Sequence, residues 1–195
     1  MGRFVNLVDS LAKIEAFKER YHILQEVGLR YCSPKQIMSH KREGEVIIPM
    51  IAFIEGGMTL PMGRITRDYL LNHRLCPHQC APNMFRVLGC VDALNEHLQL
   101  GLTWHDVVHL YECHSQADGG YYLKFRSPIV RLILCLPKSN KGMKDDYLIA
   151  SRRGMMIFIA QSERECQVGN HRVRFISKRL RFFNPNHIII SLSFC

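Results

Sequence analysis

The stretch PNMFRVLGCVDALNEHLQLG, residues 82–101, carries the clearest structural signal in this chain of 195 residues. Its apolar side chains recur at steps of three and four residues, which places them on one face of a helix. They are Met84, Val87, Leu88, Val91, Leu94 and Leu98. Proline is favoured in the first turn of a helix and glycine just beyond its end. We therefore predict a long amphipathic helix that starts at Pro82 and ends before Gly101.

Shorter helices are expected on both sides of this segment. Their predicted extents are 10–27, from Ser33 toward His40, 49–55, a short helix after Pro61, and 103–111. The last begins at Thr103-Trp-His-Asp106, where a hydroxyl followed three residues later by an acid forms a capping box. The polar loop His40–Glu45 is the expected boundary between an N-terminal helical region, 1–45, and the body of the chain, 46–150.

The hydrophobic period changes from 3.6 to 2 after the turn Asp118-Gly119-Gly120. Alternation through Tyr121-Tyr-Leu-Lys-Phe125 predicts a strand, and the apolar runs 129–136 and 147–149 predict two more. The expected fold class is α+β, with a mainly α-helical core followed by a small antiparallel β element.

Charge is unevenly distributed along the chain. The whole chain holds 26 Lys+Arg and 17 Asp+Glu, a net charge of +9. Residues 1–150 hold 18 and 15 of these, a net +3, whereas residues 151–195 hold 8 and 2, a net +6. The excess that would suggest nucleic-acid binding thus lies mostly in a basic tail, 151–195. That tail is either sequence unrelated to the fold or a C-terminal β-hairpin.

Neither a membrane span nor a secretory signal is evident. No run of about 18 apolar residues occurs, and MGRFVN lacks the apolar region of a signal peptide. We expect a cytoplasmic or nuclear protein whose eight cysteines are reduced thiols.

Two groups of residues could ligate a metal. One is His73-Asn-Arg-Leu-Cys-Pro-His-Gln-Cys80 with His114; the other is His105 with His109, four residues apart on one helical face. Zinc sites generally pair two compact motifs, and the single C-x3-C here has no matching pair. Scattered structural thiols and solvated histidines are the simpler interpretation, so we predict no metal and no cofactor.

Catalytic signatures are equally sparse. Phosphate-binding, nucleophile-elbow and zinc-protease motifs do not occur. The carboxylates that a metal-dependent nuclease or transferase would need are present but scattered. They are Asp68, Asp92, Asp106, Asp145 and Asp146. We therefore predict that the chain is not an enzyme.

The best anion-binding candidate is the loop that carries Lys138, Lys141 and Lys144. Three ammonium groups on one loop could contact phosphates. The adjacent Asp145 and Asp146 offset that potential, and a solvated connection between strands is the alternative interpretation.

Four stretches, in this order, resemble the gypsy-type transposon domain of plants. Ile51-Ala-Phe-Ile-Glu-Gly-Gly-Met-Thr-Leu-Pro61 resembles its F-x-x-x-G-L-x-L-P segment, and Ala81-Pro-Asn-Met-Phe-Arg86 its P-N-x-x-R helix start. Gly119-Gly-Tyr-Tyr122 is similar to its G-G-W-Y-Y strand entry, and Ser139-Asn-Lys-Gly-Met-Lys144 to its S-x-K-G-W-K loop. The motif positions are Pro61, Pro82, Asn83, Arg86, Gly120, Tyr121, Tyr122, Ser139, Lys141, Gly142 and Lys144.

The resemblance covers about residues 48–150, and it departs from the family at Met143 and Cys80. It implies a non-enzymatic, capsid-like (gag-type) retrotransposon domain that associates with itself, without a cofactor. Family members are commonly longer, so a truncated element is expected. A nucleic-acid-binding module that uses Lys138, Lys141, Lys144 and the basic tail on RNA or DNA is the alternative.

Overall fold

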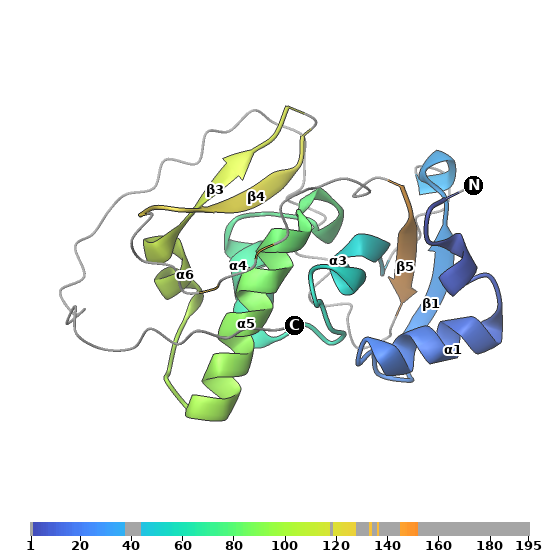
Figure 1. Ribbon diagram of the computed structural model, residues 1–195, viewed down its shortest axis with the longest axis horizontal. Coiled ribbons are helices and arrows are strands. Elements are labelled where there is room, and N and C mark those ends of the chain that lie inside the picture. The colour runs from blue at the N-terminus through green and yellow to red at the C-terminus, as the bar shows by residue number, and fades with distance from the viewer. Residues whose placement is uncertain are drawn as a thin grey trace.

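The computed structural model describes residues 2–37, 44–117, 119–127, 133, 136 and 145–151. Its α-helices are α1 (Leu11–Arg20), α3 (Met50–Ile54), α4 (Arg64–Asn72), α5 (Pro82–Leu98) and α6 (Trp104–Leu110). Its strands are β1 (Gly28–Cys32), β2 (Glu45–Pro49), β3 (Tyr111–Ser115), β4 (Tyr121–Phe125) and β5 (Tyr147–Ser151). Three 3-10 turns are η1 (Val5–Leu7), η2 (Pro34–Gln36) and η3 (Pro77–Gln79). The predicted α+β class is confirmed (Figure 1).

The long helix α5 forms as predicted, with Pro82 in its first turn. Five of the six residues of the predicted apolar stripe are buried, and only Leu98, at the end of the helix, is half exposed (50%). Gln99 then adopts a left-handed conformation with φ 50°, which ends the helix two residues before Gly101. The start signals at Thr103 and Ser33 are confirmed as well, because each carries a capping box.

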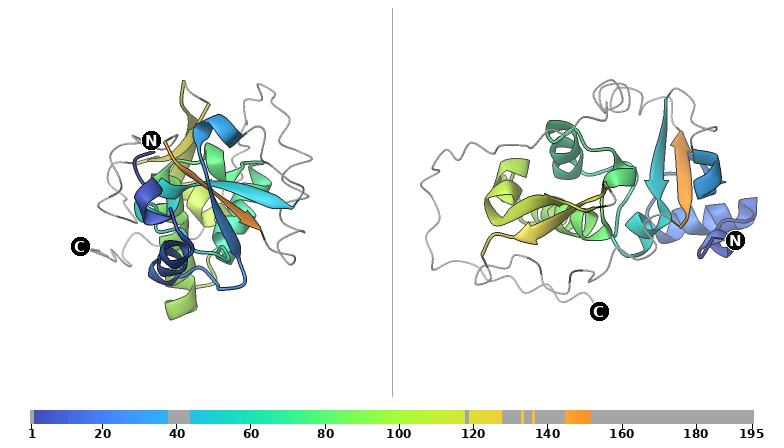
Figure 2. Two further views of the ribbon diagram at one scale, coloured as in Figure 1. Left: turned by 90° about the vertical axis from the view of Figure 1, so that its right-hand side faces the viewer. Right: turned by 90° about the horizontal axis from the view of Figure 1, so that it is seen from above.

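A three-stranded antiparallel sheet, in the order β1-β5-β2, joins distant parts of the chain. Leu148 on the central strand pairs with Tyr31 on one side and Ile48 on the other. The predicted strand at 147–149 therefore pairs with two N-terminal strands that periodicity did not reveal. The expected boundary near residue 45 runs between strands of this one sheet (Figure 2).

The first helix is shorter than predicted. It ends at Arg20 rather than near Val27, because His22 turns the chain with φ 53°. The Leu24 N–H then donates to the Leu60 carbonyl at 2.9 Å, which takes that backbone group out of helical hydrogen bonding. The apolar pattern through Leu24 was thus misleading about the helix length.

A two-stranded hairpin, β3–β4, follows the helices. β4 was predicted, whereas the helix predicted over 103–111 included Tyr111, the first residue of β3, and the rest of β3 was not predicted. The helix α6 stops at Leu110, and Tyr111 instead pairs with Phe125 on β4.

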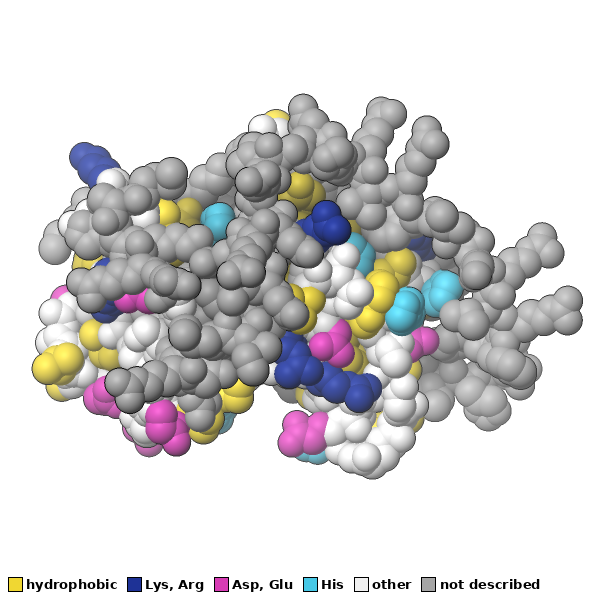
Figure 3. All heavy atoms as spheres, turned by 180° about the vertical axis from the view of Figure 1, so that it is seen from behind, with side chains coloured by type: hydrophobic (Ala, Val, Ile, Leu, Met, Phe, Trp, Pro, Cys, Tyr) yellow, Lys and Arg dark blue, Asp and Glu magenta, His cyan; other side chains and the backbone are white. Residues whose placement is uncertain are grey.

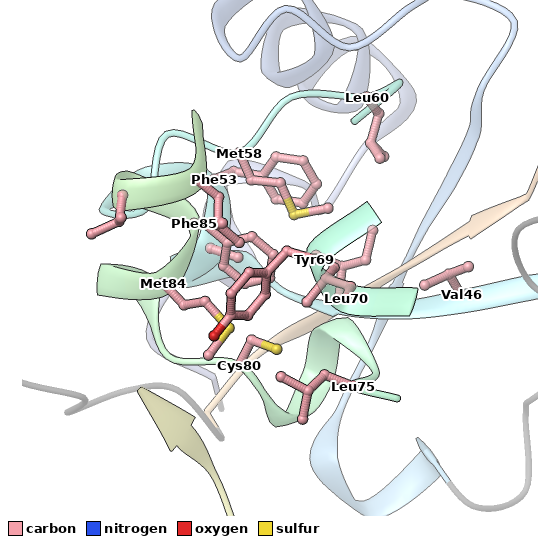
Figure 4. Packing of buried hydrophobic residues seen from close by; sticks show 14 of the residues in the cluster. Val46, Phe53, Met58, Leu60, Tyr69, Leu70, Leu75, Cys80, Met84 and Phe85 are labelled. Atoms are coloured by element: carbon pink, nitrogen blue, oxygen red, sulfur yellow. The ribbon is translucent and has the colours of Figure 1, made fainter. Parts of the chain in front are cut away.

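The main core lies between α3, α4 and α5 (Figure 4). Phe53, Tyr69, Leu70, Met84 and Phe85 are each at most 1% exposed there. Phe85, which is not part of the predicted apolar stripe of α5, is thus a core residue as well. No helix in the described parts of the chain is both long and apolar enough to span a membrane.

Several predictions fall on parts of the chain outside the described residues. They concern most of the apolar run 129–136, the lysine loop at 138–144 and the basic tail beyond Ser151. Ser151 itself, the first residue assigned to the tail, is the last residue of β5.

Candidate functional site

Three of the four motif stretches meet in one place, at the start of α5. Pro82 occupies the first turn of this helix, and the segment before it runs beside β4. The Ala81 N–H donates to the Tyr121 carbonyl at 2.8 Å, and Cys80 forms a parallel bridge with Tyr121. The P-N-x-x-R and G-G-Y-Y stretches are therefore neighbours in space.

Asn83 continues this pairing with its side chain. Its amide Nδ2 donates to the Leu123 carbonyl at 2.8 Å, and its Oδ1 accepts from the Leu123 N–H at 3.4 Å. The amide thus mimics the backbone of a neighbouring strand and satisfies both polar groups of a residue in β4. Buried backbone groups that lack such partners are costly.

Arg86, one turn further along α5, reaches in the opposite direction. Its guanidinium donates through Nε at 3.1 Å and through Nη2 to the Glu55 carbonyl at the end of α3. The last carbonyls of a helix lack intrahelical partners and carry the negative end of its dipole. The Arg86 guanidinium, which is hydrogen-bonded to the backbone carbonyl of Glu55, therefore stabilises the C-terminal end of α3.

The two glycines that follow Glu55 permit this close approach. A Cβ on Gly56 would lie 2.4 Å from the Ala52 carbonyl oxygen and 3.0 Å from both Pro82 O and Phe85 Cβ. Gly57 has a φ of +67°, a conformation that glycine adopts without strain. The segment ends at Pro61, which follows the cis Leu60–Pro61 peptide bond.

The hairpin residues of the motif also serve packing. Gly120 is buried, and its carbonyl accepts from the Gln116 N–H at 2.7 Å to close the turn. Tyr121 packs against the main core and Tyr122 against a small cluster of Ile51 and Ala81. The motif positions at the start of α5 and in the hairpin thus form one structural junction, which we call the motif junction (Pro82, Asn83, Arg86, Gly120, Tyr121 and Tyr122). Pro61 is exposed, and its neighbour Leu60 pairs with Ile23 in the N-terminal segment. Lys138, Ser139, Lys141, Gly142 and Lys144 lie outside the described residues.

The scattered carboxylates hold the fold at separate points. Asp92 on α5 accepts from the Ile65 N–H at 2.7 Å and from the Thr66 N–H at 3.1 Å. It therefore caps α4 from outside that helix. Asp106 accepts from the N–H and hydroxyl of Thr103 at 2.8 and 2.9 Å, which closes the cap of α6.

Asp146 has a third structural task, which sequence reasoning missed. It is fully buried and accepts from the Tyr31 hydroxyl at 2.6 Å and from the Phe4 N–H at 2.7 Å. It therefore fastens the N-terminal segment to β1 and β5. Burial and this carboxylate raise the pKa of Tyr31 to about 12.

The predicted metal candidates are held by other contacts. His73 stacks on Tyr69 with ring centroids 4.0 Å apart, and its Nδ1 lies 2.9 Å from the Tyr69 carbonyl oxygen. Burial lowers the pKa of His73. The Cys80 thiol donates to the Cys76 carbonyl at 3.4 Å. Across the described ranges, no three His, Cys, Asp or Glu side chains converge as metal ligands would.

Cys113 also packs into the interior, where its thiol is hydrogen-bonded to the Tyr69 hydroxyl. Burial raises the pKa of Cys113 to about 11, so the thiol is protonated at neutral pH. Its neighbour His114 contacts Glu112, at 3.2 Å between Nε2 and Oε2. These two residues thus have structural partners in the hairpin and core.

Comparison of the chain with protein-family models, with curated proteins and with solved structures finds no match in any of the three. The gypsy-type resemblance therefore stands on its motifs alone, and any function assigned to the motif junction is a proposal.

Proposed function

We propose that this chain is a non-enzymatic, gag-like domain derived from a plant retroelement, and that it functions by associating with copies of itself. The observation that supports this is the motif junction. Its side chains pack into the core or form hydrogen bonds with backbone groups. The Asn83 amide donates to the Leu123 carbonyl, and the Arg86 guanidinium donates to the Glu55 carbonyl. Motif residues whose side chains stabilise the fold suit an assembly domain, whereas the motif of an enzyme would carry reactive side chains.

The surface that we assign to self-association lies at the end of α5. Leu98 and Leu100 are 50% and 43% exposed, and they flank the left-handed Gln99 that ends the helix. Fully burying an exposed leucine is worth about 1.5–3 kcal/mol, and because Leu98 and Leu100 are about half exposed, each can contribute about half of that. Two such side chains per copy would support a weak contact that depends on protein concentration.

Sedimentation velocity on the full chain tests this surface. We expect the wild-type sedimentation coefficient to rise between low and high micromolar concentration. The double variant Leu98→Asp/Leu100→Asp should keep the monomer value throughout this range. The matched control is Leu11→Asp on α1, because Leu11 is also exposed (81%) but lies on a different element. Association that is equal in all three proteins would place the contact elsewhere.

Nucleic-acid binding through Lys138, Lys141, Lys144 and the basic tail is the second candidate. The net charge of +6 in residues 151–195, from 8 Lys+Arg and 2 Asp+Glu, favours it. It predicts binding to RNA or DNA that weakens steeply with salt and is reduced when the three lysines are replaced by alanine. Affinity unchanged in that triple variant would exclude the loop.

A further inference from the structure

Strand β3 forms an edge of the β3–β4 hairpin. β4 lies between β3 and the segment before α5 (Figure 1), and the Ala81 N–H donates to the Tyr121 carbonyl on the far side of β4. Across the described ranges, no strand pairs with the other side of β3. An edge strand presents N–H and carbonyl groups to which a strand of another chain can add.

The register shows which backbone groups of β3 point outward. Leu123 on β4 directs both of its backbone groups to Asn83, on the side away from β3. Cys113 lies directly opposite Leu123. Residues directly opposite in an antiparallel pair direct their backbone groups either toward each other or away from each other. The N–H and carbonyl of Cys113 therefore face away from β4, and so do those of Ser115, two residues further along the strand.

We propose that β3 pairs with β3 of a second copy of the chain, antiparallel and centred on Cys113. Each Cys113 N–H would then donate to the Cys113 carbonyl of the other copy. Each Ser115 N–H would donate to the other copy's Tyr111 carbonyl, whereas the Tyr111 N–H stays bonded to Val107 in its own chain. The Cys113 thiol is hydrogen-bonded to Tyr69 in the interior, so the pairing uses the backbone of Cys113 and no disulfide.

The charges of β3 favour this partner and this register. The side chains of Glu112 and His114 are 42% and 37% exposed, and Oε2 and Nε2 lie 3.2 Å apart. Arg126 contacts the other oxygen of Glu112, Oε1, at 2.8 Å. Pairing centred on Cys113 places Glu112 of each copy opposite His114 of the other, and opposite charges at such positions stabilise a sheet. A register centred on Glu112 would instead place two carboxylates opposite each other, which destabilises a sheet.

This inference rests on the proposed self-association and adds a second contact to the one at Leu98 and Leu100. On the face of the molecule in Figure 3, hydrophobic side chains are scattered among charged and polar ones, without one broad apolar patch among the coloured side chains. Hydrogen bonds between copies replace hydrogen bonds to water, so each contributes little net free energy. We therefore expect the β3 contact alone to form at millimolar concentration. This agrees with the monomer expected of Leu98→Asp/Leu100→Asp in the micromolar range.

Two-dimensional NMR of the full-length Leu98→Asp/Leu100→Asp chain tests the β3 contact by itself. A reducing agent keeps the cysteines as thiols. The amide proton resonances of Cys113 and Ser115 should move downfield as the concentration rises from micromolar to millimolar, because both N–H groups gain a hydrogen-bond acceptor. The amides of β1, an edge strand of the other sheet, are the internal control and should not move.

Two charge variants in this background test the register. Glu112→Lys places basic side chains opposite each other, and His114→Glu places acids opposite each other, so neither variant alone should show the movement. Mixing unlabelled Glu112→Lys with ¹⁵N-labelled His114→Glu brings a basic side chain opposite an acid at both positions, and the movement should return. The matched controls are Glu96→Lys and His97→Glu, at exposed positions on α5, and they should behave like the background protein.

Three results would overturn the β3 contact. The first is that the resonances of Cys113 and Ser115 stay fixed up to millimolar concentration. The second is equal movement in the single charge variants. The third is a mixture that shows no movement although both variants keep the circular dichroism of the background protein. Sedimentation of the wild-type chain tests the proposed function separately, and wild-type association with fixed resonances would reject the β3 contact alone.

Discussion

The side chain of Asn83 pairs with both backbone groups of Leu123, forty residues further along the chain. This relationship ties the start of α5 to β4, and it explains why an asparagine follows the helix-starting Pro82. An alanine at 83 would leave a backbone N–H and a carbonyl without these partners.

We therefore expect Asn83→Ala to lower the free energy of unfolding by about 1–3 kcal/mol, the usual range for orphaned buried polar groups. Chemical denaturation monitored by circular dichroism measures it. Asn72→Ala is the matched control, because its hydrogen bond to the Asp68 carbonyl is exposed. That variant should stay within about 0.5 kcal/mol of wild type. An equal decrease in the free energy of unfolding in the two variants would contradict the structural role assigned to Asn83.

The neighbouring glycines give a second prediction. Gly56→Ala would place a Cβ 2.4 Å from the Ala52 carbonyl oxygen in α3 and 3.0 Å from both Pro82 O and Phe85 Cβ in α5, so the backbone where α3 packs on α5 must shift. A Cβ on Gly57 would have no atom within 4 Å. Gly57→Ala is therefore disfavoured only by the φ of +67°, which costs a residue with a side chain about 1 kcal/mol. Thermal unfolding should therefore show a larger decrease for Gly56→Ala than for Gly57→Ala. The reverse order would contradict the described packing of α3 on α5.

The cap on α4 predicts a coupled pair of substitutions. Asp92→Ala should destabilise the fold by about 1–2 kcal/mol, because Ile65 and Thr66 lose their acceptor. A Cβ on Gly63 would lie 2.2 Å from the Asp92 carboxylate, so Gly63→Ala should also destabilise. In the double variant the carboxylate is gone and the overlap disappears. The combined loss should therefore be smaller than the sum of the single losses, and strict additivity would rule out this contact.

The stability should also depend on pH through His73. Burial lowers the pKa of His73 in the folded state below its ordinary value of 6.5, so the unfolded chain takes up the proton first. The contribution of His73 is thus fully present above pH 6.5 and is lost as the pH falls below it. We expect the urea midpoint to drop less between pH 7.5 and pH 5.5 in His73→Phe than in wild type. His97→Ala should follow the wild-type curve, and a parallel curve for His73→Phe would refute the assignment.

Elements that depend on local sequence signals could be predicted from the sequence, whereas elements that depend on contacts between distant residues could not. The helices at 82–98 and 104–110 were predictable because their periodicity, Pro82 and the Thr103–Asp106 capping box are local signals. β1 and β2 were missed because their pairing partner, β5, lies about a hundred residues away and neither strand alternates clearly.

The same limit applies to the motif junction. The motifs identified Asn83 and Arg86, but their partners Leu123 and Glu55 contribute only backbone groups, which no side-chain pattern marks. Asp92 and Asp146 were noted as scattered acids, and their capping and anchoring roles arise from tertiary contacts alone. Gly63, directly before α4, was the one sequence signal of a close approach to Asp92.

Self-association of the full chain is the central claim, and sedimentation equilibrium across a hundredfold range of concentration tests it most directly. We predict a weight-average mass that starts near the 22.6 kDa of one chain and rises steadily with concentration. A mass that stays at that of one chain up to the highest concentration would contradict the account.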